Sequence, residues 1–118
     1  MKAVQRDAGY LDDILLAIGK INRYVNGMDL ADFVANDMAQ DAVLRNIAII
    51  GEAVGKLSKD LTARYPEVPW INISGMRNRL VHEYNGVNLK MVWNTIQQVL
   101  PDFHATIQAI RSTQQVSE

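Results

Sequence analysis

The sequence predicts an all-α protein, an up-down bundle of four main helices with short extra helical turns. Apolar residues recur at alternating steps of three and four along four segments, which is the periodicity of one buried helix face. No segment alternates convincingly between apolar and polar residues, so strands are not expected. The 118 residues include only three prolines and seven glycines, too few for a loop-rich all-β domain.

The length and composition are those of one globular domain. A chain of 118 residues with 48% hydrophobic residues can bury a single core. We expect one domain over residues 1–118, with an ordered core over about residues 7–111. The absence of cysteine excludes disulfides, cysteine-based zinc sites and thiol nucleophiles. With no run of about 18 apolar residues and no apolar signal-peptide segment at the N-terminus, we expect a soluble cytoplasmic protein.

The first helix is expected over about residues 7–25. Asn26 and Gly27 follow it, and a glycine just past the last apolar residue is a common helix stop. A short helical turn is expected within residues 29–36. The apolar stripe of the first helix consists of Leu11, Ile14, Ile18, Ile21 and Val25.

The second helix is expected over about residues 38–58. It contains Gly51 and Gly55, and each glycine inside a helix costs about 1 kcal/mol relative to alanine. Two interpretations remain open. The glycines either form a groove where another helix or another subunit approaches closely, or they relieve crowding within one monomer. The stripe consists of Val43, Ile47, Ile50, Val54, Leu57 and Leu61.

The last two helices are set by their boundary residues. Pro69 suits the first turn of the third helix, and the turn dipeptide Asn85–Gly86 predicts that this helix ends near residues 83–84. Asn88 is a candidate N-cap for the final helix. Pro101 lies inside that helix and should kink or split it. The final stripe consists of Leu89, Val92, Ile96, Val99, Phe103, Ile107 and Ile110.

The charge balance restricts any contact with nucleic acid to a small region. General nucleic-acid-binding proteins usually carry a strong basic excess, because phosphate contacts dominate their affinity. This chain has a net charge of −1. Residues 77–90 nevertheless hold three cations and one anion, Glu83. An RNA contact is therefore expected to be local to this segment.

The segment from Arg77 to Tyr84 concentrates the side chains that can do chemistry. An arginine carries a permanent charge on a planar group that fits phosphate, and a histidine such as His82 exchanges a proton near neutral pH. Together they are the minimum needed to cleave a phosphodiester without a metal. The alternative interpretation is a capped helix end, with Arg79 and His82 favouring the helix dipole and Tyr84 serving as a core aromatic with its hydroxyl in water.

On one ideal helix these groups do not all share a face. Arg77 and His82 are five residues apart and point about 140° away from one another. Asn78 and Arg79 are better placed to touch His82, at spacings of four and three. For Arg77 to meet His82 at a substrate, the helix must end early or the site must be shared between subunits.

The segment reads R-x₄-H-x-Y at Arg77, His82 and Tyr84, and it resembles the HepT-like branch of the HEPN superfamily. The resemblance covers about residues 8–110, since further segments match in order. These are DAVLRN at 41–46, IGEA at 50–53, YP at 65–66, PW at 69–70, GMRN at 75–78, VW at 92–93 and LP at 100–101.

The resemblance implies a homodimeric, metal-independent endoribonuclease that needs no cofactor and acts as the toxin of a type VII-like toxin–antitoxin pair. Carried over to this chain, Arg77 and His82 are the expected catalytic residues. Asn78 matches the polar position after the motif arginine and, with Arg79, is a candidate supporting group.

The resemblance also implies a partner, an antitoxin that resembles a minimal nucleotidyltransferase (MntA-like) and transfers AMP from ATP onto Tyr84. An attached AMP would add a charged phosphate and a bulky nucleoside two residues from His82, and would repel RNA. The chain departs from the family pattern at Asn85, where relatives often have phenylalanine, and at Asn88, where they often have aspartate.

Other interpretations stay open at this point. The protein would alternatively be a non-catalytic module that holds RNA or nucleotide, or that only docks a nucleotidyltransferase; a purely structural bundle ranks last. Glu52 is equally compatible with a catalytic role and with a hydrogen bond that ties helices or subunits together. His104 is expected to be a surface or packing residue. No metal requirement is predicted, because no cluster with metal-ligand spacing accompanies the motif.

Overall fold

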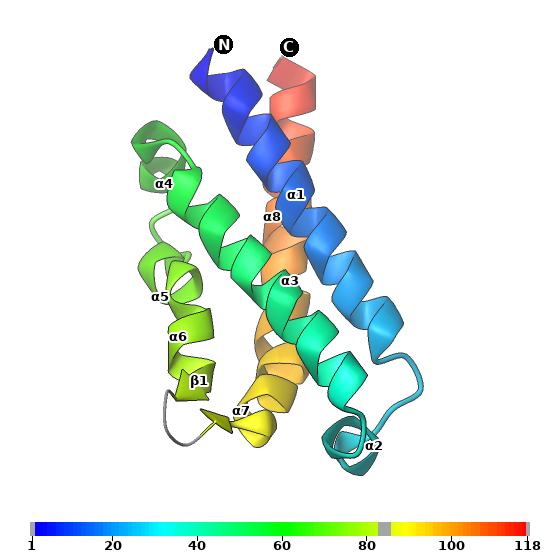
Figure 1. The fold of residues 1–118 in the computed structure, drawn as a ribbon. Coiled ribbons are helices and arrows are strands. Elements are labelled where there is room, and N and C mark those ends of the chain that lie inside the picture. The colour runs from blue at the N-terminus through cyan, green and yellow to red at the C-terminus, as the bar shows by residue number, and fades with distance from the viewer. Residues whose placement is uncertain (1, 83–85, 118) are drawn as a thin grey trace.

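Four main helical segments run alternately down and up the molecule (Figure 1). The computed structural model describes residues 2–82 and 86–117. Helix α1 (Ala3–Tyr24) runs down, α3 (Asp37–Lys56) returns, and α5 (Trp70–Ser74) with α6 (Met76–Leu80) runs down again. The chain then returns through α7 (Leu89–Asn94), η1 (Thr95–Val99) and α8 (Leu100–Ser117). The predicted up-down bundle with short extra helical turns is confirmed.

The core forms where the predicted stripes of these helices face one another. Leu11, Ile14 and Ile21 of α1 have no exposed surface, and neither do Ile47 and Ile50 of α3. Burying such side chains contributes roughly 1.5–3 kcal/mol each. Among the described residues, no helix combines the length and the apolar character needed to cross a membrane.

The connection from α1 to α3 is built from residues with turn and capping chemistry. Gly27 has a positive φ of +80°, a conformation that glycine adopts without steric cost. The Asp29 carboxylate then accepts a 2.8 Å hydrogen bond from the Asp32 amide and starts α2 (Leu30–Val34). The Asn36 side chain accepts a 2.9 Å bond from the Ala39 amide and starts α3.

Asp7 is the main departure near the N-terminus. We expected the first helix to begin there, but α1 begins at Ala3 and Asp7 lies inside it, 3% exposed. Its carboxylate accepts 2.8 Å and 2.6 Å hydrogen bonds from the amide and the hydroxyl of Ser58. Ser58 in turn caps α4 (Lys59–Arg64), where its Oγ accepts from the Leu61 amide at 3.2 Å. The buried acid therefore fixes the α3–α4 corner against α1.

Trp70 fixes the start of α5. Its indole Nε1 donates to the main-chain oxygens of Thr62 and Tyr65, at 3.2 and 3.0 Å. Its ring lies edge-on to Phe103, with 6.2 Å between ring centroids. These contacts connect α4, α5 and α8, and they set the position from which the chain enters α6.

The last segment of the bundle is interrupted before Pro101. We predicted a kink or a split there, and the structure contains the π-helical turn η1, in which the Leu100 amide donates to the Thr95 oxygen. Because proline has no N–H and crowds the carbonyl four residues earlier, a wider turn accommodates it. The predicted cap is confirmed: the Asn88 side chain accepts from the Met91 amide at 3.1 Å.

Candidate functional site

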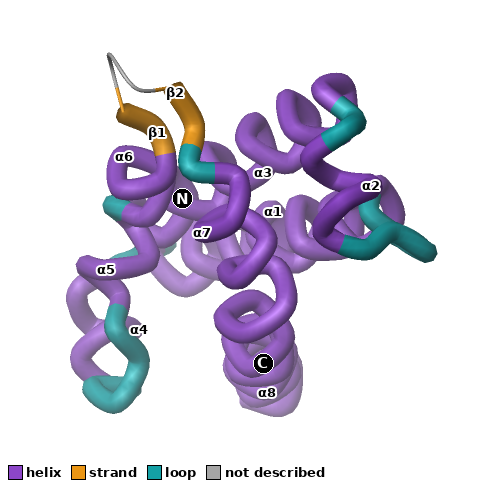
Figure 2. The backbone as a smooth tube through the Cα atoms, turned by 90° about the horizontal axis from the view of Figure 1, so that it is seen from below, coloured by secondary structure: helices purple, strands orange, loops and turns teal. Residues whose placement is uncertain are grey.

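Arg77 and His82 lie at the end of the bundle where α6 leads into strand β1, which pairs with β2 (Figure 2). Met76 and Leu80 are buried and lie four residues apart, so they anchor the inner face of α6. Arg77, Asn78 and Arg79 between them are all exposed. One short helix therefore presents three polar motif side chains at the surface.

Helix α6 ends earlier than the sequence predicts. We expected helix to residue 83 or 84, but Val81 is extended, with φ −116° and ψ 120°. Strand β1 (Val81–His82) pairs antiparallel with β2 (Gly86–Val87), in register Val81 to Val87. The strands were not expected, because two residues are too few to show an alternating pattern. The Asn88 amide also donates to the Leu80 oxygen at 2.9 Å and closes the hairpin at its base.

This early end changes the geometry expected of an ideal helix. His82 has strand backbone, so its spacing from Asn78 and Arg79 no longer places it on their helix face. One of the two conditions under which Arg77 and His82 can share a substrate is therefore met. Gly86 begins strand β2 with a φ of +73°, a conformation that glycine adopts without steric cost. Tyr84, the predicted modification site, lies outside the described residues, as do Glu83 and Asn85.

The guanidinium of Arg77 is uncommitted within the described part of the chain. Its residue is exposed, and no hydrogen bond or ion pair joins its side chain to any of residues 2–82 or 86–117. Asn78 is also exposed. Its main-chain N–H donates to the Gly75 oxygen at 3.2 Å, and no hydrogen bond joins its side chain to another described residue. A free guanidinium at a surface is available to bind an anion such as phosphate.

Arg79, by contrast, has a structural partner. Its Nη2 donates a 2.6 Å hydrogen bond to the main-chain oxygen of Asn72. Asn72 lies in the last turn of α5, where carbonyl groups lack helical partners and basic side chains often bond them. Arg77 and Arg79 are two residues apart, about 200° around a helix. They therefore project toward nearly opposite sides of α6.

Gly51 sets how closely the α5–α6 junction approaches α3. A Cβ atom added to Gly51 would lie 2.7 Å from the main-chain oxygen of Ser74, too close for any side chain. A Cβ added to Gly55 would meet nothing within 4 Å. Gly51 therefore fits the interpretation in which another helix approaches closely, and that helix belongs to the same chain. Its effect is to place Ser74, and so the start of α6, directly on α3.

Comparison with known proteins assigns this arrangement to a family. Residues 14–110 match the family described as Ribonuclease HepT-like. The chain belongs to the HepT-like ribonuclease family. The matched region contains α6, both strands and all the motif residues named from the sequence, and the predicted resemblance is confirmed.

Relatives with curated names cover nearly the whole chain. A protein of Caldanaerobacter subterraneus named "Putative RNase TTE0752" is 38% identical over 86% of this chain and 90% of its own. "Putative RNase MJ0125" of Methanocaldococcus jannaschii is 36% identical over 86% and 87%. "Probable ribonuclease HepT" of Thermococcus cleftensis is 33% identical over 94% and 99%. No solved structure shows a significant match.

The two other polar candidates lie away from the α6 surface. Glu52 is exposed on α3 and forms an ion pair with Lys56, one helical turn on, at 3.7 Å. It lines a hollow between α1 and α3 whose described lining residues do not include Arg77, Asn78 or Arg79. His104 is half-buried on α8. Among the residues that the structure describes, no three His, Cys, Asp or Glu side chains are grouped to hold a metal.

Sequence reasoning missed a groove beside α6. Two adjoining hollows of about 300 Å³ each share Pro69, Ile73 and Val99. Together they form one depression between α5–α6 on one side and α7, η1 and α8 on the other. We call it the α5–α8 groove. Arg79 lines one of its hollows. The interruption expected at Pro101 was the sequence signal for a depression near this helix. It does not show which helix forms the other side of the groove.

Proposed function

We propose that this protein is a metal-independent endoribonuclease whose catalytic residues are Arg77 and His82. The observation that carries the proposal is the uncommitted guanidinium of Arg77, which lies in the short helix directly before the strand that contains His82. Membership of the HepT-like ribonuclease family supports the same activity. The alternative of a capped helix end fits Arg79 and not Arg77.

The proposed chemistry uses the RNA strand as its own nucleophile. A base removes the proton from a 2′-hydroxyl, whose oxygen attacks the adjacent phosphorus and forms a 2′,3′-cyclic phosphate. The P–O5′ bond breaks, and an acid protonates the departing 5′-oxygen. His82 is the candidate for the proton transfers. Arg77 is the candidate that stabilises the negative charge developing on the phosphate oxygens.

Two copies of the chain would complete the site. Because Arg77 and Arg79 project to opposite sides of α6, one chain offers one guanidinium to a phosphate on the Arg77 side. A homodimer with a two-fold axis near this surface would contribute a second Arg77 and a second His82 to one cleft. Asn78, exposed between the two arginines, would then support the phosphate by donating from its amide.

We further propose that the protein is the toxin of a toxin–antitoxin pair and that a minimal nucleotidyltransferase silences it. The acceptor of AMP would be Tyr84, which follows His82 by two residues. Its phosphate would compete with RNA for Arg77, and its nucleoside would obstruct the same surface.

The decisive experiment is RNA cleavage by purified, unmodified protein in excess EDTA. We expect cleavage to persist in EDTA and to fall by at least about 100-fold in His82→Ala, on the scale of losing a main catalytic group. His104→Ala is the matched control, since the chain has two histidines, and it should cut normally. Equal cleavage by the His82 and His104 variants would refute the role of His82.

A second candidate, a non-catalytic module that holds RNA or docks a nucleotidyltransferase, is favoured by the net charge of −1. It predicts that the protein cleaves no RNA with or without added metal ions, and that Arg77→Ala binds the nucleotidyltransferase as tightly as the wild type. Cleavage that depends on His82 excludes it.

A further inference from the structure

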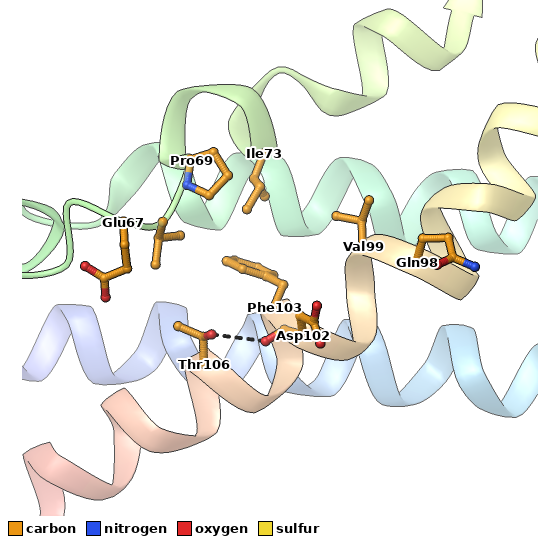
Figure 3. A pocket seen from close by; sticks show the side chains of 9 residues that line it. Glu67, Pro69, Ile73, Gln98, Val99, Asp102, Phe103 and Thr106 are labelled. Atoms are coloured by element: carbon orange, nitrogen blue, oxygen red, sulfur yellow. Dashed lines mark hydrogen bonds between the residues drawn. The ribbon is translucent and has the colours of Figure 1, made fainter.

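The α5–α8 groove has opposite charges at its two ends. Figure 3 shows one of its hollows, with Phe103 in the middle and the carboxylates of Glu67 and Asp102 on either side. Gln98 and Thr106 are the remaining polar residues that the structure describes in this hollow, and none of its described lining residues is cationic. Among the described residues that line the other end, Arg79 is the cation and none is acidic. A ligand that fits must therefore carry negative charge at one end and hydrogen-bond donors at the other.

The floor of the groove is apolar. Ile73, Phe103 and Val68 are at most 8% exposed and form the bottom of the acidic hollow. Met76 and Leu80 form the bottom of the hollow that contains Arg79. Each hollow has the volume at which small-ligand sites begin. A flat, largely apolar ring fits such a floor.

The guanidinium at the cationic end is held in place. The 2.6 Å bond from Nη2 of Arg79 to the Asn72 oxygen uses one of its five N–H donors and leaves the others available. Fixing a guanidinium in advance lowers the entropy lost when it binds an anion. The rim beside it carries the hydroxyl of Thr95, which donates to the Met91 oxygen at 2.9 Å and leaves its own lone pairs free to accept.

We propose that the groove binds one nucleotide unit of single-stranded RNA, with guanine as the preferred base. The proposal rests on the endoribonuclease function and adds a specificity site to it. The phosphate lies at Arg79, and the base lies over Phe103 between Glu67 and Asp102. The reverse orientation would place phosphate against two carboxylates.

Guanine is the base whose edge matches these acceptors. Its N1–H and N2 amino groups lie side by side, and a carboxylate accepts such a pair of donors in a bidentate arrangement. Adenine and cytosine offer an amino group without an adjacent ring N–H. Uracil offers one ring N–H between two carbonyl oxygens, which a carboxylate repels. The expected order of affinity is guanine first, adenine and cytosine next, and uracil last.

The methionines allow a test that does not depend on cleavage. Met76 and Met91 line the groove, whereas Met28 and Met38 line a separate hollow between α1 and α3. In protein labelled with ¹³C at the methionine methyl groups, 5′-GMP should shift the resonances of Met76 and Met91 and leave those of Met28 and Met38 unchanged. UMP at the same concentration should shift them less.

The acidic end is tested by Asp102→Asn. Losing one charged acceptor should weaken GMP binding by about tenfold or more, because hydrogen bonds to charged groups are stronger than those between neutral groups. It should also reduce the preference for GMP over UMP. Asp41→Asn, an exposed aspartate on α3 that does not line the groove, is the control and should bind normally.

The outcomes separate this inference from the proposed function. Shifts at Met28 and Met38 alone, no shift at millimolar GMP, or equal binding of GMP and UMP would each overturn the guanine site. RNA cleavage by the same preparation would still stand in those cases. Conversely, selective shifts at Met76 and Met91 would support the site even if His82→Ala cut RNA normally.

Discussion

Arg79 bonds the main-chain oxygen of Asn72 at 2.6 Å, and it thereby joins the end of α5 to α6. The neighbouring Arg77 has no partner among residues 2–82 and 86–117. Two arginines that look equivalent in the sequence therefore have different roles. Arg79 joins two helices and lines the α5–α8 groove, whereas the side chain of Arg77 is available to a substrate phosphate on the opposite side of α6.

Alanine substitutions at these two arginines should give opposite results. Arg77→Ala should leave the melting temperature unchanged and reduce RNA cleavage by about 100-fold or more, as expected when charge stabilisation at the phosphate is lost. Arg79→Ala should lower the free energy of unfolding by about 0.5–1 kcal/mol, through loss of one carbonyl cap. Thermal unfolding and cleavage assays on the same samples test this, and a stability loss confined to Arg77→Ala would contradict it.

The two glycines of α3 should respond differently to alanine. Gly51→Ala forces a Cβ against the Ser74 oxygen, and overpacking of this kind typically costs about 1–3 kcal/mol. Gly55→Ala meets no atom within 4 Å and should stabilise the helix by up to about 1 kcal/mol. Urea unfolding of both variants measures the difference. If both substitutions change the free energy of unfolding in the same direction, the inferred close contact between Gly51 and Ser74 is wrong.

Asp7→Ala should destabilise the α3–α4 corner. The substitution leaves the amide and hydroxyl of Ser58 without their acceptor, and unsatisfied buried donors cost about 1–3 kcal/mol. Asp13→Ala, on the exposed part of the same helix, should change stability by less than about 0.5 kcal/mol. Chemical denaturation of the pair decides the matter, and equal midpoints would show that the Asp7–Ser58 bonds contribute nothing.

Tyr84 should be the acceptor of AMP when the protein is co-expressed with a minimal nucleotidyltransferase. Intact mass spectrometry should detect added AMP on the wild type and none on Tyr84→Phe, because phenylalanine has no hydroxyl to accept the phosphate. Tyr24→Phe is the control and should be modified normally. AMP that persists on the Tyr84 variant would identify a different acceptor.

The fold followed from the sequence wherever periodic burial decided it. The stripe that includes Leu11 and Ile14, and the one that includes Ile47 and Ile50, are buried as predicted. Local residue chemistry also predicted the N-cap at Asn88 and the helix interruption near Pro101. The start of α1 was misplaced, because Asp7 resembles a helix-starting residue until Ser58, 51 positions away, is known to bond it.

The site was only partly predictable. The choice of Arg77, Asn78, Arg79 and His82 came from residue type and family resemblance, and their roles stay predictions. The expected helix through His82 was wrong, since α6 ends at Leu80. The turn predicted at Asn85–Gly86 stays a prediction, because Asn85 lies outside the described residues. The pairing of Val81 with Val87 depends on two strands too short to leave a pattern.

The sequence by itself determined the class of fold, the family and the set of polar residues available for chemistry, because hydrophobic periodicity and residue type are local properties. Only the tertiary structure decided that Arg79 is bonded to Asn72, that Gly51 receives Ser74, and that the α5–α8 groove exists. Each of these depends on which segments meet in space. Hydrogen bonds and van der Waals contacts act over a few ångströms, irrespective of separation along the chain.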